Sequence, residues 1–167
     1  MKKIIITLFV IAGFMAVQAQ NNFSNPAISV GVVVEDLQKS IDFYTEVIGM
    51  VKTGGFSVSK EQCKELGLTD SYQLDVTVLK PIDNEFSSEW KLMSLGTESQ
   101  HPKQKYMSDD TGIQYITLFV KQVQPILDRA VNTNVTILSQ KPSKLDDGRN
   151  FLLLQDPDGN FIEIIGN

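Results

Sequence analysis

The same order of strand and helix patterns occurs twice along this chain. Residues 27–34 form a β-branched run typical of a strand, and an amphipathic helical pattern follows until Gly49. A second strand pattern at residues 113–120 leads into a second helical pattern at residues 123–131. Further strand patterns lie at residues 50–58, 72–79 and 90–95 in the first half, and at residues 135–139, 150–155 and 160–165 in the second. Each half therefore predicts the order β-α-β-β-β, with an offset of about 85 residues between the halves.

This repeat predicts how the chain is divided. The polar segment at residues 97–111 has no sustained period and is predicted to connect a first module, residues 27–96, to a second, residues 112–167. A length of 167 residues favours one compact domain, residues 27–167, that contains both modules. Residues 20–26 then form a short tail before this domain.

The first 19 residues have the pattern of a secretory signal peptide. Lys2 and Lys3 precede an apolar run at residues 4–17, and small residues follow just before Gln20. The run is shorter than the roughly 20 apolar residues that a membrane-spanning helix needs. No cysteine follows it at the position that a bacterial lipoprotein uses for its lipid, so no membrane anchor is expected. The sequence therefore predicts a periplasmic or secreted protein with a bacterial Sec-type leader, and a buried N-terminal helix is the alternative.

Charge and cysteine content narrow the possible partners. Without Lys2 and Lys3 the chain carries 13 basic against 20 acidic residues, a net charge of about −7. An acidic surface repels phosphate backbones, so a nucleic acid partner is not expected. Cys63 is the only cysteine and cannot form an internal disulfide. A small molecule or another protein remains as the partner.

Two motifs connect the repeat to a known family. The first is Val-Glu-Asp-Leu at residues 34–37 with Ile-Asp-Phe-Tyr at residues 41–44, and the second is Asp-Pro-Asp-Gly-Asn at residues 156–160 with Glu163. Together with the repeat they resemble the vicinal oxygen chelate superfamily of glyoxalases, bleomycin-resistance proteins and extradiol dioxygenases. The resemblance covers residues 27–166. It implies an α+β fold in which two βαβββ modules form a curved mixed sheet around a cleft.

The resemblance also implies where metal ligands would stand. Metal-dependent members commonly carry a histidine on the opening strand of each module, and here those positions hold Ser29 and Tyr115. On the strand at residues 90–95 the candidates are Lys91 and Met93, which share one face, and Glu163 alone keeps the expected ligand type. A catalytic metal site needs about three protein ligands. No cofactor is therefore expected.

A divalent metal, if one binds, would take an oxygen-rich set of side chains. The candidates are Glu163, Asp75 and the single histidine, His101, which lies in the connector. Strand alternation and the resemblance together suggest a larger set that lines the cleft. This set is Ser29, Gln73, Asp75, Trp90, Met93, Tyr115, Phe119, Phe161 and Glu163.

Three functions follow from these residues. The leading interpretation is an exported protein that binds a small molecule in its cleft, where acidic Asp75 and Glu163 would favour a cation. The second is a glyoxalase-like lyase, isomerase or dioxygenase, either with an unusual metal or without metal, in which Glu163 acts as base and Tyr115 as acid or oxyanion donor. The third is an interaction protein with a vestigial cleft. The resemblance makes a homodimer a further expectation.

Overall fold

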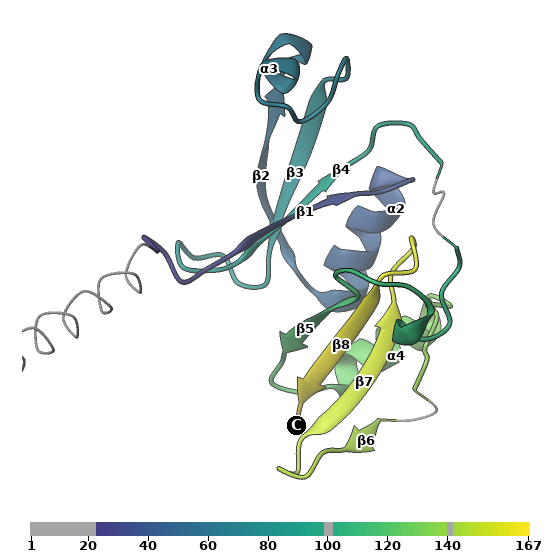
Figure 1. Cartoon of the computed structure of the whole chain (residues 1–167). Coiled ribbons are helices and arrows are strands. Elements are labelled where there is room, and N and C mark those ends of the chain that lie inside the picture. Colours follow the sequence, from purple (N-terminus) through teal and green to yellow (C-terminus); the bar gives the residue numbers. More distant parts are fainter. Residues whose placement is uncertain (1–22, 99–101, 140–141) are drawn as a thin grey trace, which may run out of the picture.

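The computed structural model describes residues 23–98, 102–139 and 142–167. The expected signal peptide and His101 lie outside these residues. The described residues form two separate sheets with few helices (Figure 1). The α+β fold class predicted from the sequence is confirmed. In the described part of the chain, no helix is both long enough and apolar enough to span a membrane.

The first sheet has four strands in the order β1-β4-β3-β2. Its strands are β1 (Ser29–Val33), β2 (Val51–Val58), β3 (Leu74–Lys80) and β4 (Glu89–Met93). Strand β1 pairs in parallel with β4, and the other neighbours are antiparallel. Strands β2 and β3 extend as an arm that carries the short helix α3 (Lys60–Glu65) at its tip (Figure 1).

The second sheet repeats this topology with the order β5-β8-β7-β6. Its strands are β5 (Tyr115–Phe119), β6 (Ser143–Lys144), β7 (Asn150–Gln155) and β8 (Phe161–Gly166). Strand β5 pairs in parallel with β8, as β1 does with β4. A 3-10 turn, η3 (Met107–Asp109), lies between the two sheets in sequence.

Local sequence explains where the helix of each module begins and ends. Helix α2 (Leu37–Asp42) begins after Asp36, whose carboxylate accepts a hydrogen bond from the Lys39 N–H at 3.0 Å. It continues as a π-helix, η2 (Phe43–Ile48), and ends at Gly49, whose φ of 95° is the left-handed conformation that glycine adopts without strain. Helix α4 (Gln124–Asn132) occupies the same place in the second module.

The helix-bearing sides of both sheets share one hydrophobic core. Its buried side chains are Val34, Phe43, Tyr44, Val47, Ile48, Met50, Leu79, Trp90 and Leu92 from the first module, and Val123, Ile126, Ala130, Leu152, Leu154, Ile162 and Ile164 from the second. Burial of this much apolar surface is the main force that holds the modules together. The opposite side of each sheet therefore points away from the shared core.

Polar contacts at the same junction fix the turn between β7 and β8 to the first module. The buried carboxylate of Asp156 accepts hydrogen bonds from the Tyr44 hydroxyl at 2.8 Å and from the Asn160 N–H at 2.8 Å. Asp158 accepts a hydrogen bond from the Glu35 N–H at 2.9 Å. Burial raises the pKa of Asp156, and burial together with the nearby Asp156 charge raises the pKa of Tyr44 well above its ordinary value. This turn motif therefore joins the modules as well as reversing the chain.

One predicted strand is replaced by irregular chain. Residues 135–139 were expected to form a strand, but they make only an isolated bridge between Ile137 and Leu154. The N–H groups of both Leu138 and Ser139 point at the carbonyl of Leu153, which breaks the regular ladder. The edge of the sheet is instead formed by the two residues of β6.

Candidate functional site

The outward side of the first sheet, called the first face below, is arranged in three rows that cross its strands. The registers place Ser29, Glu89 and Lys80 in a polar row, which ends on β2 at the exposed side chain of Val51. Gly31, Lys91, Val78 and Gly54 form the next row, called the glycine row. Val33, Met93, Val76 and Phe56 form the third, the apolar row. Part of this side is covered, because Val76 and Val78 pack with buried Cys63 of α3.

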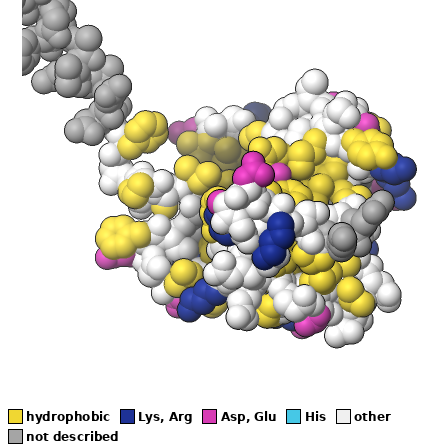
Figure 2. Space-filling model, turned by 90° about the horizontal axis from the view of Figure 1, so that it is seen from below, with side chains coloured by type: hydrophobic (Ala, Val, Ile, Leu, Met, Phe, Trp, Pro, Cys, Tyr) yellow, Lys and Arg dark blue, Asp and Glu magenta, His cyan; other side chains and the backbone are white. Residues whose placement is uncertain are grey.

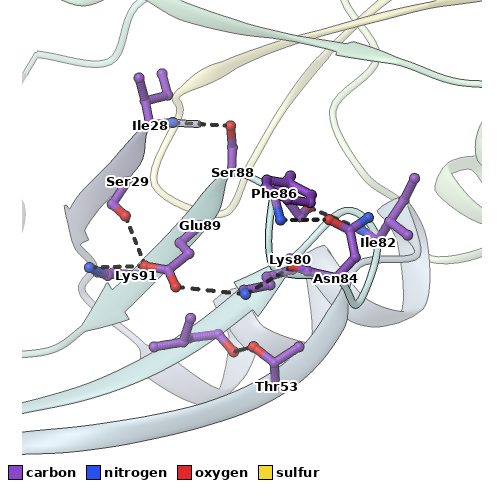
Figure 3. A network of polar contacts seen from close by, with 12 residues as sticks. Ile28, Ser29, Thr53, Lys80, Ile82, Asn84, Phe86, Ser88, Glu89 and Lys91 are labelled. Carbon is purple, nitrogen blue, oxygen red and sulfur yellow. Dashed lines mark hydrogen bonds and ion pairs between the residues drawn. The ribbon is translucent and has the colours of Figure 1, made fainter. Parts of the chain in front are cut away.

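Lys91 of the glycine row forms one charged network with the three polar side chains of the polar row, Ser29, Glu89 and Lys80 (Figure 3). The Glu89 carboxylate accepts a hydrogen bond from the Ser29 hydroxyl at 2.8 Å and lies 3.1 Å from the Lys91 ammonium. The Lys80 ammonium is 3.9 Å from the other oxygen of Glu89. The Ser29 hydrogen bond, then the contacts with Lys91, hold the pKa of Glu89 below its ordinary value. Two ammonium groups therefore share one carboxylate.

Apolar groups border this network on the other side of the glycine row. The Lys91 ammonium lies 5.8 Å from the centre of the Phe56 ring, which is 48% exposed. Val33, at the far end of the apolar row, is 55% exposed. Gly31 stands directly beside Lys91 and contributes no side chain. The first face thus has a polar edge, an apolar edge and a shallow strip between them.

The outward side of the second sheet, called the second face, has a simpler polar pair. The Thr117 hydroxyl donates a hydrogen bond to the half-buried Glu163 carboxylate at 2.7 Å across β5 and β8. Tyr115 and Phe119 flank Thr117 on the same side of β5, and Phe119 is 71% exposed. The Arg149 guanidinium lies 5.5 Å from the centre of the Phe119 ring. Figure 2 views the molecule from below Figure 1, where hydrophobic side chains lie next to acidic and basic ones on the surface.

The structure divides the predicted site residues between the two faces. Ser29 and Met93 lie on the first face. Tyr115, Phe119 and Glu163 lie on the second. Because the helix-bearing sides of the sheets share a core, the two groups point away from that core rather than toward each other within one chain. Lys91 and Met93 both lie on the first face, as their spacing on the strand predicted.

The orientation expected for Trp90 and Asp75 is wrong. The Trp90 ring is packed in the shared core, with its centre 5.5 Å from that of Tyr44. Asp75 lies on the side of β3 opposite the first face, where it is exposed and accepts hydrogen bonds from Ser57 and Gln73. The alternation of β3 misleads here because Val76 and Val78 pack with Cys63 of α3 on the first face, while Leu79 packs in the shared core on the opposite side.

Phe161 is also unavailable as an exposed wall. It stands opposite Tyr115 and Gln155 but is 1% exposed. The Gln155 side-chain amide donates a hydrogen bond to the Gln104 carbonyl at 2.9 Å, so the connector crosses the second sheet at this level. Phe161 therefore lies on the side of β8 that carries Glu163, but its side chain is buried.

Sequence reasoning missed several members of both faces. Glu89 and Lys80 were not named because the strand was taken to begin at Trp90 and the preceding strand to end at Leu79. Extending the later strand by one residue at period two would have placed Glu89 on the face of Lys91, whereas the face of Lys80 depends on the pairing of β3 with β4. Thr117 could have been found as the neighbour of Tyr115 on the same side of β5.

A hollow of about 1010 Å³ lies at the junction of the modules. It is lined by the end of β1, by the connector and by the turn at residues 156–160. The carboxylates of Asp156 and Asp158 at its edge accept hydrogen bonds from the first module. These contacts join the two modules beside the hollow.

The comparisons with known proteins agree with this architecture. The family model of the Glyoxalase/Bleomycin resistance protein/Dioxygenase superfamily matches residues 28–164. The chain belongs to this superfamily. The resemblance inferred from the sequence motifs is confirmed. A search of curated proteins found no match.

Solved structures show the superfamily fold at low sequence identity. A glyoxalase family protein from Bacillus cereus is 17% identical with a TM-score of 0.70, over 89% of this chain and 97% of that one. Glyoxalase I of Leishmania major is 24% identical with a TM-score of 0.56, over 86% and 87% of the two chains. A lactoylglutathione lyase from Agrobacterium tumefaciens is 12% identical with a TM-score of 0.52, over 87% and 96%. At these identities the likeness concerns the fold alone.

The donor set does not fit the divalent ion that many superfamily members bind. The Lys91 ammonium is not a ligand and repels a cation, and Glu89 beside it is already held by Ser29. The described members of the oxygen-rich alternative are not brought together either, because Asp75 lies on the side of β3 opposite the first face and Glu163 lies on the second face. Within residues 23–98, 102–139 and 142–167, no three His, Cys, Asp or Glu side chains are grouped for a metal.

Proposed function

We propose that this protein binds a small molecule without chemically changing it. The observation that carries the proposal is the exposure of large apolar side chains beside half-buried polar groups on both faces. Val33, Phe56, Tyr115 and Phe119 are each about half exposed or more, next to the Glu89 and Glu163 pairs. Exposed apolar groups around a few oriented polar groups are typical of ligand-binding surfaces. Residues 1–19 have the pattern of a leader, so we expect this role outside the cytoplasm.

We propose further that two copies pair to enclose the ligand. The first face of one copy would cover the second face of the other, because the two faces of one chain point away from their shared core. Such pairing would bury the exposed apolar groups and form two equivalent binding sites by twofold symmetry. The expected homodimer and the expected small-molecule ligand are then parts of one proposal.

A thermal-shift screen with amphipathic and aromatic compounds tests the binding role. A compound that stabilises the wild type should lose its effect with Gly31→Leu on the first face or with Phe119→Ser on the second. The control is Leu66→Ser, which removes an exposed apolar side chain on the arm, at the end of α3 and outside both faces. The proposal is wrong if no compound stabilises the wild type, or if the compounds that do so stabilise both face variants equally well.

Mixing the two face variants tests the pairing. A pair formed from Gly31→Leu and Phe119→Ser chains has one site in which both faces are altered and one in which both are intact. About half of the binding capacity per mixed pair should therefore return after the two proteins are unfolded and refolded together. If each site lies within one chain, the mixture will stay inactive. Sedimentation of the wild type should show a dimer.

A further inference from the structure

We infer that the first face binds the anionic group of its ligand at Lys91, with the apolar part of the ligand lying over the glycine row. This inference rests on the proposed small-molecule role and adds the chemical class of the ligand. It concerns small molecules that combine a carboxylate, sulfonate or similar anion with an apolar body.

The charge of the first face is the first argument. Lys80 and Lys91 share the single carboxylate of Glu89, so this network has an excess of one positive charge in a protein of net charge −5. The side chain of Lys91 is 28% exposed. Its ammonium carries three N–H donors, and the hydrogen bonds of the described residues use one of them, toward Glu89. Lys91 can therefore donate to an anion while keeping its contact with Glu89.

The shape of the first face is the second argument. Gly31 lies beside Lys91, and Gly54 ends the same row on the edge strand β2. A side chain begun at Gly54 would have no atom within 4 Å, and one begun at Gly31 would meet only the Met93 methyl at 3.6 Å. The backbone is thus uncovered next to the ammonium. A flat apolar group has room there to lie against the row of Val33 and Met93.

The order of the rows makes the ligand amphipathic. On β1, β4 and β3, the polar side chains of Ser29, Glu89 and Lys80 lie on one side of the glycine row, and apolar side chains lie on the other. A ligand that is only charged would leave Val33 and Phe56 exposed, and a ligand that is only apolar would remove Lys91 from water without compensation. A ligand with a charged part and an apolar part can contact both Lys91 and the apolar row. The cation expected from Asp75 is not favoured here, because Asp75 lies on the other side of the sheet.

Two dyes with the same rings test the inference on the full-length mature protein. 8-Anilinonaphthalene-1-sulfonate carries an anionic group, and N-phenyl-1-naphthylamine has the same apolar body without it. Fluorescence titration at low salt should show the sulfonate binding about fivefold tighter or more. Lys91→Met should weaken the sulfonate about fivefold to tenfold by removing one charge-assisted hydrogen bond, and should change the neutral dye less than twofold.

Two further variants separate the possible failures. Lys52→Met removes an exposed lysine from the other side of the same sheet and should change neither dye. Gly31→Leu should weaken both dyes, because it fills the strip beside Lys91. Near-UV circular dichroism checks that each variant keeps its tertiary packing.

The outcomes distinguish this inference from the proposed function. Equal affinity for the two dyes, or a sulfonate affinity that Lys91→Met leaves unchanged, overturns the anionic class while the binding role stands, provided that Gly31→Leu still weakens both. If the wild type binds neither dye, or if Gly31→Leu affects neither, both the inference and a binding site on the first face are wrong.

Discussion

The two sheets of this protein share one topology, yet their outward faces hold a carboxylate in different ways. On the first face Glu89 accepts a hydrogen bond from Ser29 and also pairs with two lysines. On the second face Glu163 accepts a hydrogen bond from Thr117 at 2.7 Å. Among the described residues no lysine or arginine forms an ion pair with Glu163.

This difference shows what the fold determines and what it leaves to the side chains. In each module the first strand pairs in parallel with the last, so a hydroxyl on one strand meets a carboxylate on the other. Topology places the polar pair, and the neighbouring residues decide its charge. A lysine two residues after Glu89 makes the first face locally cationic, whereas Ile165 stands in that place after Glu163.

The largest effect is expected where both faces depend on the same contact. Asp156→Ala removes the acceptor of the Tyr44 hydroxyl and of the Asn160 N–H inside the junction. Each buried donor left without a partner costs about 1 to 3 kcal/mol, so the free energy of unfolding should fall by about 3 to 5 kcal/mol. Urea denaturation measures this loss. Tyr44→Phe, which removes one hydroxyl, should cost about 1 kcal/mol or somewhat more. A loss below 1 kcal/mol for Asp156→Ala would show that the junction does not need this carboxylate.

A smaller effect separates the faces directly. Glu89→Gln and Glu163→Gln should each lower the free energy of unfolding by less than about 1 kcal/mol, because both carboxylates are partly exposed. Only the loss from Glu89→Gln should shrink when salt is raised, since added ions screen its pairing with Lys80 and Lys91. Urea denaturation at low and high salt measures both. Equal salt dependence of the two variants would show that ion pairing does not distinguish Glu89 from Glu163.

Apart from the strand expected at residues 135–139, the order of elements could be predicted from sequence, but the side of the sheet that each strand presents could not. Helical spacing ending at Gly49 and the β-branched runs are local patterns, and both were found in the structure. Strand β3 has apolar residues on both sides, Leu79 toward the core and Val76 toward α3, so alternation alone does not identify its inner side. Asp75 was misplaced for that reason.

The site was harder to predict because it depends on contacts between strands. Ser29 and Glu89, which form a hydrogen bond, are 60 positions apart in the chain. The predicted strand began at Trp90, one residue too late, so Glu89 was not considered as a site residue. The direction in which the two faces point depends on how the helices of both modules pack, which no local pattern reports. The sequence identified Ser29, Tyr115 and Glu163 as face residues but could not say that they belong to different sides of the molecule.

A shift in the pKa of Glu89 tests the contact that is specific to the first face. Its folded pKa is lowered, chiefly by the Ser29 hydroxyl, so its contribution to stability is present above the unfolded pKa and is lost as pH falls through the folded pKa. Ser29→Ala should raise the folded pKa toward the ordinary value and reduce this contribution. Carboxyl-carbon NMR titration measures the change. A pKa that stays in place after Ser29→Ala, but rises after Lys91→Met, would assign the shift to the ion pair instead.

The smallest expected effect in the wild type concerns metal ions. Stoichiometric Zn²⁺, Mn²⁺, Ni²⁺, Fe²⁺ or Ca²⁺ should shift the melting temperature by less than about 1 °C. A metal site present only in the folded state would raise the melting temperature by more than this. The physical reason is the Lys91 ammonium, which lies 3.1 Å from Glu89 where a cation would have to stand. Lys91→Glu replaces that ammonium by a second carboxylate on the first face, so it should increase the shift with Ca²⁺ or Mn²⁺ above that of the wild type. One equivalent of tightly held metal in wild-type protein purified without chelator would contradict this account. It would also make the metal-dependent chemistry of the superfamily the leading hypothesis.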